Sequence, residues 1–247
     1  MTPTTTSLRI ERAGTTLALE LDRPDKMNAL DAPLVEALLE VVTRAYTDGT
    51  RVLVLRGNGR NFSAGFDLSD LERASEGDLL LRFVRVEELL QAVHHAPYET
   101  IAIAHGRNFG AGVDLVCACA RRIADPDTTF RMPGLQFGLV LGTRRFANRV
   151  GQARARTILQ TSATFNASQA LEMGFCERVA PRDTWREIAE AIAGPAGALS
   201  SEAGAALHRC TTTDSRTQDM VELVRSACAP GLKDRIRAYR STQRPGS

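Results

Sequence analysis

The chain has 247 residues, of which 43% are hydrophobic and 24% are charged. This composition is typical of a globular protein with one large domain, or with one domain and a small appendage. The 31 Lys and Arg residues exceed the 29 Asp and Glu residues by only two, which argues against a nucleic-acid partner or a membrane-surface partner.

Five dispersed cysteines form no CxxC pair, so the sequence predicts no metal site and suits a reducing compartment. Residues 1–14 lack the basic start and apolar core of a signal peptide. No apolar run approaches the roughly 18 residues of a membrane span. We therefore expect a cytoplasmic protein that crosses no membrane.

The N-terminal quarter predicts two strands with a helix between them. Residues 15–21 alternate apolar and polar side chains, which is typical of a half-buried strand. The segment 31–49 has a helical pattern, with Asp31 as its N-cap and a glycine at its end. Residues 51–59 form an apolar run that ends in glycines, which indicates a buried strand.

Strands and helices continue to alternate through the middle of the chain. We expect helices over 79–96 and 110–122, and strands over 100–106, 121–125 and 128–130. This alternation favours an α/β fold.

The C-terminal part has a different character. The strand signal fades after about residue 190, and residues 193–207 are small and polar, which indicates a junction. The segments 217–228 and 232–241 are amphipathic and predict helices. The last segment is locally basic, and either a solvated helix face or a contact to an anionic ligand explains this. We predict a core over 1–190 and a helical region over 191–247.

Two predicted strands run into glycine-rich turns, at 52–68 and 101–115. The first turn lacks the third glycine of a dinucleotide fingerprint, because Phe62 stands there. In the second turn a helix begins near Gly110, and the first N–H groups of a helix have no internal partner. Such groups stabilise an oxygen that gains negative charge in a reaction, although ordinary turn formation explains either turn taken alone.

Four motifs occur in a fixed order along the chain. They are RPDKMNAL (23–30), NFSAGFDL (61–68), HGRNFGAGVDL (105–115) and GTRRFANRVG (142–151). Together they resemble the enoyl-CoA hydratase/isomerase family, the crotonase superfamily. The resemblance implies a crotonase-like ββα spiral with a C-terminal helical region that builds homotrimers or hexamers. It also implies an acyl-CoA thioester as ligand, with CoA as part of the substrate and no other cofactor.

The resemblance assigns roles to individual residues. The backbone N–H groups of Phe66 and Ala111 would hold the thioester oxygen as it becomes an enolate. The CoA moiety would lie near the other loop positions of these motifs, which are Lys26, Ala29, Ala64, Asp67, Leu68 and Gly110.

The acid–base positions depart from the family pattern. Family hydratases hold one water between two glutamates, but Asp114 stands at the first position and Gly134 at the second. Glycine cannot transfer a proton, so one catalytic position lacks its acid. Asp114 is a candidate acid or base. A structural ion pair with Arg107 or Arg144 would explain it as well.

We therefore expect an acyl-CoA-binding protein, and an enzyme, that polarises a thioester but hydrates enoyl-CoA poorly. Another enolate reaction at the same site, such as isomerisation, decarboxylation or thioester hydrolysis, is an alternative. A non-catalytic acyl-CoA-binding scaffold subunit is another. His105 ends the strand before the second turn, and a buried structural histidine fits it better than a catalytic base.

Overall fold

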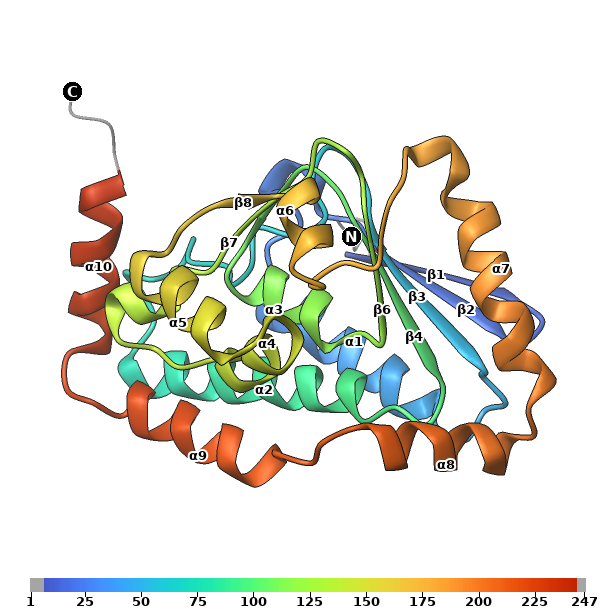
Figure 1. Ribbon diagram of the computed structural model, residues 1–247. Helices are drawn as coiled ribbons and strands as arrows, with labels where there is room; N and C mark the ends of the chain where they lie inside the picture. The colour runs from blue at the N-terminus through green and yellow to red at the C-terminus, as the bar shows by residue number, and fades with distance from the viewer. Residues whose placement is uncertain (1–6, 244–247) are drawn as a thin grey trace.

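The computed structural model describes residues 7–243 (Figure 1). Its strands are β1 (Leu8–Ala13), β2 (Thr16–Leu21), β3 (Val52–Gly57), β4 (Glu99–Ala104), β5 (Arg107–Phe109), β6 (Arg121–Ala124), β7 (Thr129–Arg131), β8 (Phe165–Asn166) and β9 (Arg178–Val179). Its α-helices are α1 (Ala32–Arg44), α2 (Glu76–His94), α3 (Ala111–Ala118), α4 (Thr143–Val150), α5 (Gln152–Thr161), α6 (Ala167–Glu172), α7 (Trp185–Ala198), α8 (Ser201–Thr211), α9 (Arg216–Ala227) and α10 (Leu232–Gln243). Short 3-10 turns are η1 (Pro24–Lys26), η2 (Gly134–Phe137) and η3 (Arg182–Thr184).

The strands form two sheets. The larger sheet has the order β1-β2-β3-β4-β6-β9, and the smaller sheet has the order β5-β7-β8. In the larger sheet only β1 and β2 pair antiparallel, while the other pairs are parallel. Helices connect the parallel strands, as parallel pairing requires. The predicted α/β class is therefore confirmed.

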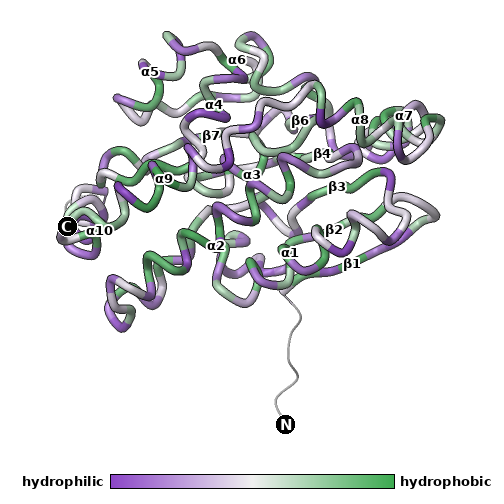
Figure 2. Tube along the Cα trace, turned by 90° about the horizontal axis from the view of Figure 1, so that it is seen from below, coloured by the Kyte–Doolittle hydropathy of each residue, from purple (hydrophilic) through white to green (hydrophobic). Residues whose placement is uncertain are grey.

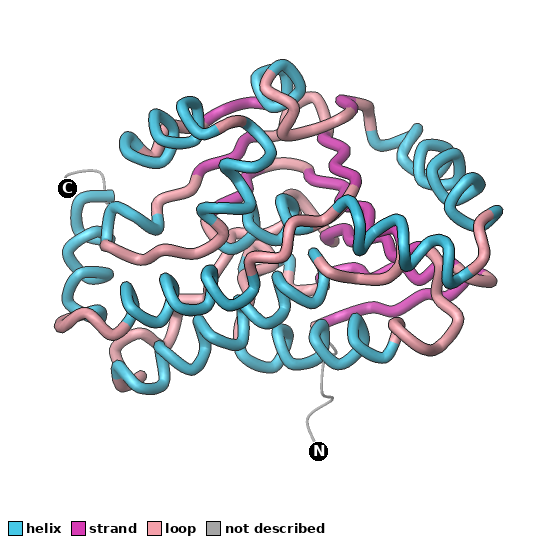
Figure 3. The backbone as a smooth tube through the Cα atoms, turned by 60° about the horizontal axis from the view of Figure 1, so that its bottom comes forward, coloured by secondary structure: helices cyan, strands magenta, loops and turns pink. Residues whose placement is uncertain are grey.

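Helices cover both faces of the larger sheet (Figures 1 and 3). Leu53 and Leu55 of β3 join a core cluster with α1, α2 and α3. Val52 and Val54 belong to a second cluster with Ile188 of α7. Because successive side chains of a strand point to opposite faces, an apolar run such as β3 can serve both clusters.

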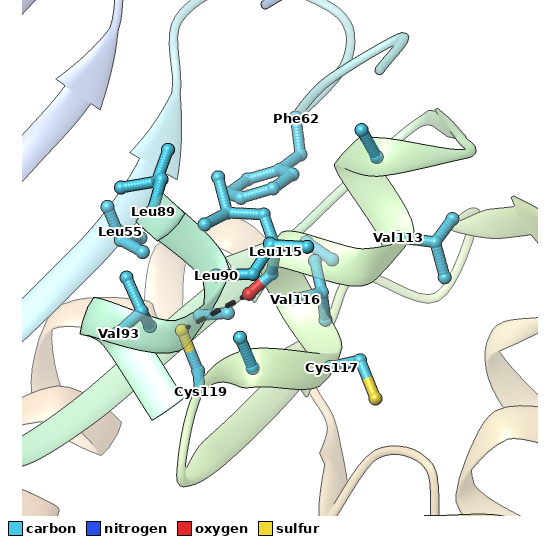
Figure 4. Packing of buried hydrophobic residues seen from close by; sticks show 14 of the residues in the cluster. Leu55, Phe62, Leu89, Leu90, Val93, Val113, Leu115, Val116, Cys117 and Cys119 are labelled. Carbon is cyan, nitrogen blue, oxygen red and sulfur yellow. Dashed lines mark hydrogen bonds between the residues drawn. The ribbon is translucent and has the colours of Figure 1, made fainter. Parts of the chain in front are cut away.

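Helix α3 passes through the larger core, and all eight of its residues are buried. Figure 4 shows Leu115 of α3 packed near Phe62 and Leu90. A helix that is apolar nearly all round needs burial on every side. This packing fixes the positions of Ala111 and Asp114, which lie in the first turn of α3.

Helices α9 and α10 lie at one end of the molecule, and α7 and α8 lie at the other (Figure 2). Leu223, Leu232 and Ile236 are buried in a third cluster with Leu79 and Phe83 of α2. The two amphipathic C-terminal helices predicted from the sequence are confirmed. Their apolar faces pack on the chain's own core.

The predicted junction over 193–207 is mostly helical. Helix α7 runs to Ala198 and α8 begins at Ser201, so only two residues separate them. Alanine has the strongest helix propensity, and the many alanines here outweigh the helix-breaking glycines and Pro195. The proposed division at residue 190 falls inside α7 and stays a prediction.

Within residues 7–243, no helix has the length and hydrophobicity needed to span a bilayer. The same residues contain no cluster of three or more His, Cys, Asp or Glu side chains suited to a metal ion. All five cysteines are free thiols.

Candidate active site

A cavity of about 370 Å³ opens where the two glycine-rich turns meet the segment after β7 and helix α10. Its walls are mainly apolar, with few polar groups, which is the usual character of a small-molecule site. Seven of the ten site positions predicted from the sequence line it. They are Ala64, Phe66, Leu68, Gly110, Ala111, Asp114 and Gly134.

The Phe66 amide is turned away from the neighbouring backbone. The Leu30 N–H donates to the Gly65 carbonyl (2.7 Å), and the Asp67 N–H donates to the Leu30 carbonyl (3.1 Å). These two bonds make an isolated parallel bridge between Leu30 and Phe66. In such a bridge the N–H of Phe66 points away from Leu30. The Phe66 N–H has no hydrogen-bonding partner within residues 7–243.

The Ala111 amide lies close to Gly65, the residue that precedes Phe66. Ala111 is the first residue of α3, where N–H groups have no partner inside the helix, and its N–H has none elsewhere in residues 7–243. Gly65 has a φ of 80°, and a Cβ there would lie 3.1 Å from Ala111 N and overlap the Phe109 carbonyl oxygen. Only glycine allows this close approach. Two residues whose N–H groups lack partners within residues 7–243 thus line one cavity.

The Asp114 carboxyl group is buried, and its Oδ1 has no hydrogen-bonding partner in the described part of the chain. Burial raises its pKa well above the ordinary value, and the charge of Arg145 opposes this only in part. Burial therefore favours the protonated form of Asp114 over the carboxylate. A protonated carboxyl group at a cavity wall can donate a hydrogen bond or a proton.

The ion pair considered for Asp114 is not present. Arg144 Nε instead donates to Asp219 (2.9 Å). Arg107 is exposed on β5, whereas Asp114 is buried. The explanation of Asp114 as a structural partner of either arginine is therefore wrong.

Gly134 begins the turn η2 and lines the same cavity. A Cβ at this residue would lie 3.0 Å from the Leu139 carbonyl oxygen, so the backbone is closely packed here. Among the lining residues, all within 7–243, Asp114 is the only carboxylic acid. The cavity therefore holds one carboxyl group, not the pair that family hydratases use.

Three predicted CoA contacts lie outside this lining. Lys26 is exposed on the turn η1, and Ala29 follows it. Asp67 is buried and forms an ion pair with Arg23 (2.9 Å). Burial alone would raise the pKa of Asp67, but hydrogen bonds from Ser69 and Arg23 outweigh this and hold it below the usual range. The Asp67 carboxylate thus supports the turn, and the CoA contacts stay predictions.

His105 is buried but is not part of the cavity lining. Its ring lies against Trp185, with ring centroids 5.5 Å apart. Burial lowers its pKa to about 4, and neither ring nitrogen has a hydrogen-bonding partner within residues 7–243. The structural interpretation of His105 is favoured over a catalytic one.

Several polar residues of the cavity were not predicted from the sequence. Arg131 lies opposite Phe109 in the β5–β7 pairing. Its only sequence signal was its place in the motif FRMPG, two residues before Pro133. Tyr239 and Gln243 reach the cavity from α10, and nothing local in the sequence indicates that α10 returns to this point.

The family model for enoyl-CoA hydratase/isomerase matches residues 11–224. The chain belongs to the enoyl-CoA hydratase/isomerase family. This family member is 35% identical over 174 residues to "Probable enoyl-CoA hydratase echA6" of Mycobacterium tuberculosis, and the match covers 69% of each chain. It is 31% identical over 188 residues to "Enoyl-CoA isomerase/hydratase fer4" of Mycosarcoma maydis, with 71% of this chain and 69% of that one covered.

Solved structures of the family agree with the fold. A crystal structure from Bordetella parapertussis, provisionally named an enoyl-CoA hydratase/isomerase, superposes with a TM-score of 0.95 at 49% identity, covering 98% of this chain and 100% of that one. An enoyl-CoA hydratase from Bacillus halodurans gives a TM-score of 0.83 at 22% identity, with 94% and 99% covered. The second likeness shows the fold alone. The crotonase-like spiral with a helical C-terminal region is therefore confirmed.

Proposed function

We propose that this family member binds an acyl-CoA thioester and stabilises its enolate form with the backbone N–H groups of Phe66 and Ala111. The observation that carries the proposal is the pair of N–H groups that lack partners within residues 7–243 and border one apolar cavity. Fixed donors in a water-poor site favour an oxygen that becomes charged over one that stays neutral. One such donor typically contributes ~10²–10³ in kcat.

Asp114 is the acid–base group that we propose for the reaction. Its carboxylate form would take the proton from the carbon next to the thioester, which leaves the enolate, and the carboxylic acid that results would return this proton to the same carbon or to the γ-carbon. Proton transfer at the carbon next to the thioester carbonyl needs one acid–base side chain. Hydration also needs a second group that activates the water. The single carboxyl group of the cavity therefore favours isomerase-like enolate chemistry over hydration.

Decarboxylation and thioester hydrolysis use the same enolate or oxyanion stabilisation and remain alternatives, as does a non-catalytic acyl-CoA-binding scaffold subunit. Turnover of a panel of saturated, 2-enoyl, 3-enoyl and malonyl thioesters separates these. Turnover that is lost in Asp114→Asn supports an enzyme. Tight binding without any turnover supports the scaffold. We further propose a cytoplasmic homotrimer or hexamer with no cofactor beyond CoA.

Calorimetric titration with butyryl-CoA, CoA and butyrate tests the binding. We expect butyryl-CoA to bind more tightly than either CoA or butyrate, because only the thioester places its oxygen between the two N–H groups. Equal or undetectable binding of all three compounds would remove the oxyanion-hole argument.

A Gly65→Ala variant tests the hole itself. The added methyl group would displace the Phe109 carbonyl and press on the Ala111 amide. Gly49→Ala is a matched control, since Gly49 has a φ of 86° against 80° for Gly65 and has open space around it. We expect Gly65→Ala to weaken butyryl-CoA binding by about 10-fold or more and Gly49→Ala to leave it unchanged.

A further inference from the structure

Arg131 is the only Lys or Arg among the cavity-lining residues, all of which lie within residues 7–243. Its Nε donates to the carbonyl oxygen of Ser162 (3.1 Å) and to Ser162 Oγ (3.3 Å). Its Nη1 donates to Gln243 Oε1 (2.9 Å). The guanidinium group is therefore held on two sides, and its Nη2 donates to no group of the described residues.

Within residues 7–243, no carboxylate forms an ion pair with Arg131. Its side-chain partners within residues 7–243 are a hydroxyl, a carbonyl and an amide oxygen, and none is a carboxylate. By contrast, Arg23 is paired with Asp67. Burial raises the pKa of Asp114, the only carboxylic acid in the lining, and so favours its uncharged form. The cavity thus carries one unbalanced cationic group, a suitable partner for an anionic group of a ligand.

Arg131 is hydrogen-bonded to the turn at Gly110 and lines both the cavity and a neighbouring hollow. Its carbonyl oxygen accepts the Gly110 N–H (2.9 Å). Burial raises the pKa of Tyr239, and the nearby charge of Arg131 opposes that rise. A second, more open hollow of about 470 Å³ shares Arg131, Phe137, Tyr239 and Gln243 with the first cavity. The guanidinium group therefore stands where a long ligand would pass from the cavity toward solvent.

We infer that Arg131 and Gln243 form an anion subsite at the mouth of the cavity, for a phosphate group of CoA or for a carboxylate on the acyl chain. This inference rests on the proposed function, since both anions belong to an acyl-CoA. A guanidinium group offers paired N–H donors that match phosphate and carboxylate oxygens alike. A phosphate contact would make Arg131 part of CoA recognition, whereas a carboxylate contact would select dicarboxylic acyl thioesters.

Four thioesters separate the two sources of the anion. Hexanoyl-CoA carries phosphates only, adipoyl-pantetheine a carboxylate only, adipoyl-CoA both and hexanoyl-pantetheine neither. Their dissociation constants are measured for the wild type and for Arg131→Gln, Arg131→Lys and Arg154→Gln. Arg154 is an exposed residue of α5 outside the cavity lining, so its variant is the control for loss of one positive charge.

Arg131→Gln should weaken binding of the thioesters that carry the recognised anion by about 10- to 100-fold, the usual range for a hydrogen bond to a charged group. Arg131→Lys should retain part of the affinity, and Arg154→Gln should match the wild type. A loss confined to the two CoA thioesters assigns the phosphate. A loss confined to the two adipoyl thioesters assigns the carboxylate.

Two results would overturn the inference alone. One is an Arg131→Gln variant that binds all four compounds as tightly as the wild type does. The other is an equal loss for hexanoyl-pantetheine, which carries neither anion and would reveal a merely structural role. A wild type that binds none of the four thioesters would overturn the proposed function, and this inference with it.

Discussion

The carboxyl group of Asp114 lies directly against the α-carbon of Gly142, so closely that a methyl group on residue 142 would overlap Oδ1. Gly142 is the N-cap of α4 and has a left-handed backbone conformation, with a φ of 63°. Its lack of a side chain leaves space for Asp114, but its α-carbon offers no hydrogen bond. This contact explains how a buried carboxyl oxygen can lack a partner within residues 7–243.

Gly142→Ala should destabilise the protein more than Gly14→Ala does. Both glycines have similar positive φ angles, 63° and 59°, so both variants carry a left-handed penalty of about 1–2 kcal/mol. Only at residue 142 does the new methyl group meet Asp114, while nothing lies within 4 Å of it at residue 14. Thermal unfolding should show Gly142→Ala melting several degrees below Gly14→Ala. Equal melting temperatures would contradict the contact.

Asp114→Asn should gain stability over the wild type as the pH rises. The folded-state pKa of Asp114 is raised above 3.8, its reference value in an unfolded chain. Above about pH 4 the unfolded chain loses this proton while the folded chain keeps it, so wild-type stability falls through that window. Asparagine does not titrate and escapes this loss. Melting temperatures between pH 4 and pH 9 should therefore diverge in favour of the variant. A difference in melting temperature that does not change with pH would show that the folded-state pKa of Asp114 is near its ordinary value.

Some features of the fold that depend on neighbouring residues were predicted from the sequence, whereas strand β1 and the helical character of residues 193–207 were not. The alternating pattern before Pro24 is strand β2, and Asp31 caps α1 by accepting the Leu34 N–H (3.0 Å). The short strands β8 and β9 were not predicted, because two residues cannot show a hydrophobic period. Their pairing is decided by distant segments, such as β6 for β9.

The same distinction applies to the site. Phe66 and Ala111 could be placed from the sequence because each belongs to a local glycine motif, and both line the cavity. The contact between Arg131 and Gln243 joins residues 112 positions apart. No pattern within either segment encodes it, since it depends on how α10 packs at the end of the molecule. The Asp114–Gly142 contact was missed for the same reason.

Sedimentation equilibrium should show a homotrimer or a hexamer. The apolar faces of α9 and α10 are already buried within the chain, so another surface must contribute to the interface. Leu207 of α8 and Val221 of α9 are large apolar side chains that remain exposed. Scattered exposed apolar residues also occur on monomers, so sedimentation equilibrium is needed to decide the oligomeric state. A single monomeric species at micromolar concentration would contradict the prediction.

Crotonyl-CoA hydration by the wild type should be several orders of magnitude slower than by a hydratase with two glutamates. One positioned acid–base group is typically worth ~10²–10⁴ in rate, and Gly134 removes one. Asp114 is one methylene group shorter than glutamate, which withdraws its carboxyl group by about 1.5 Å. A displacement of ~1 Å can reduce a rate ~10²-fold. The fall in enoyl-thioester absorbance measures the rate.

Restoring both carboxyl groups should recover more hydration than restoring either one. Gly134→Glu alone leaves Asp114 short, and Asp114→Glu alone leaves the second position empty. The double variant also requires the Leu139 carbonyl to yield slightly, because a Cβ at residue 134 would lie 3.0 Å from its oxygen. Gly134→Gln with Asp114→Glu is the control of equal size without the second acid. A double variant no faster than this control would show that hydration lacks something other than the carboxyl group. A wild-type rate equal to that of an ordinary hydratase would show that another residue supplies the acid, and that the roles assigned to Asp114 and Gly134 are wrong.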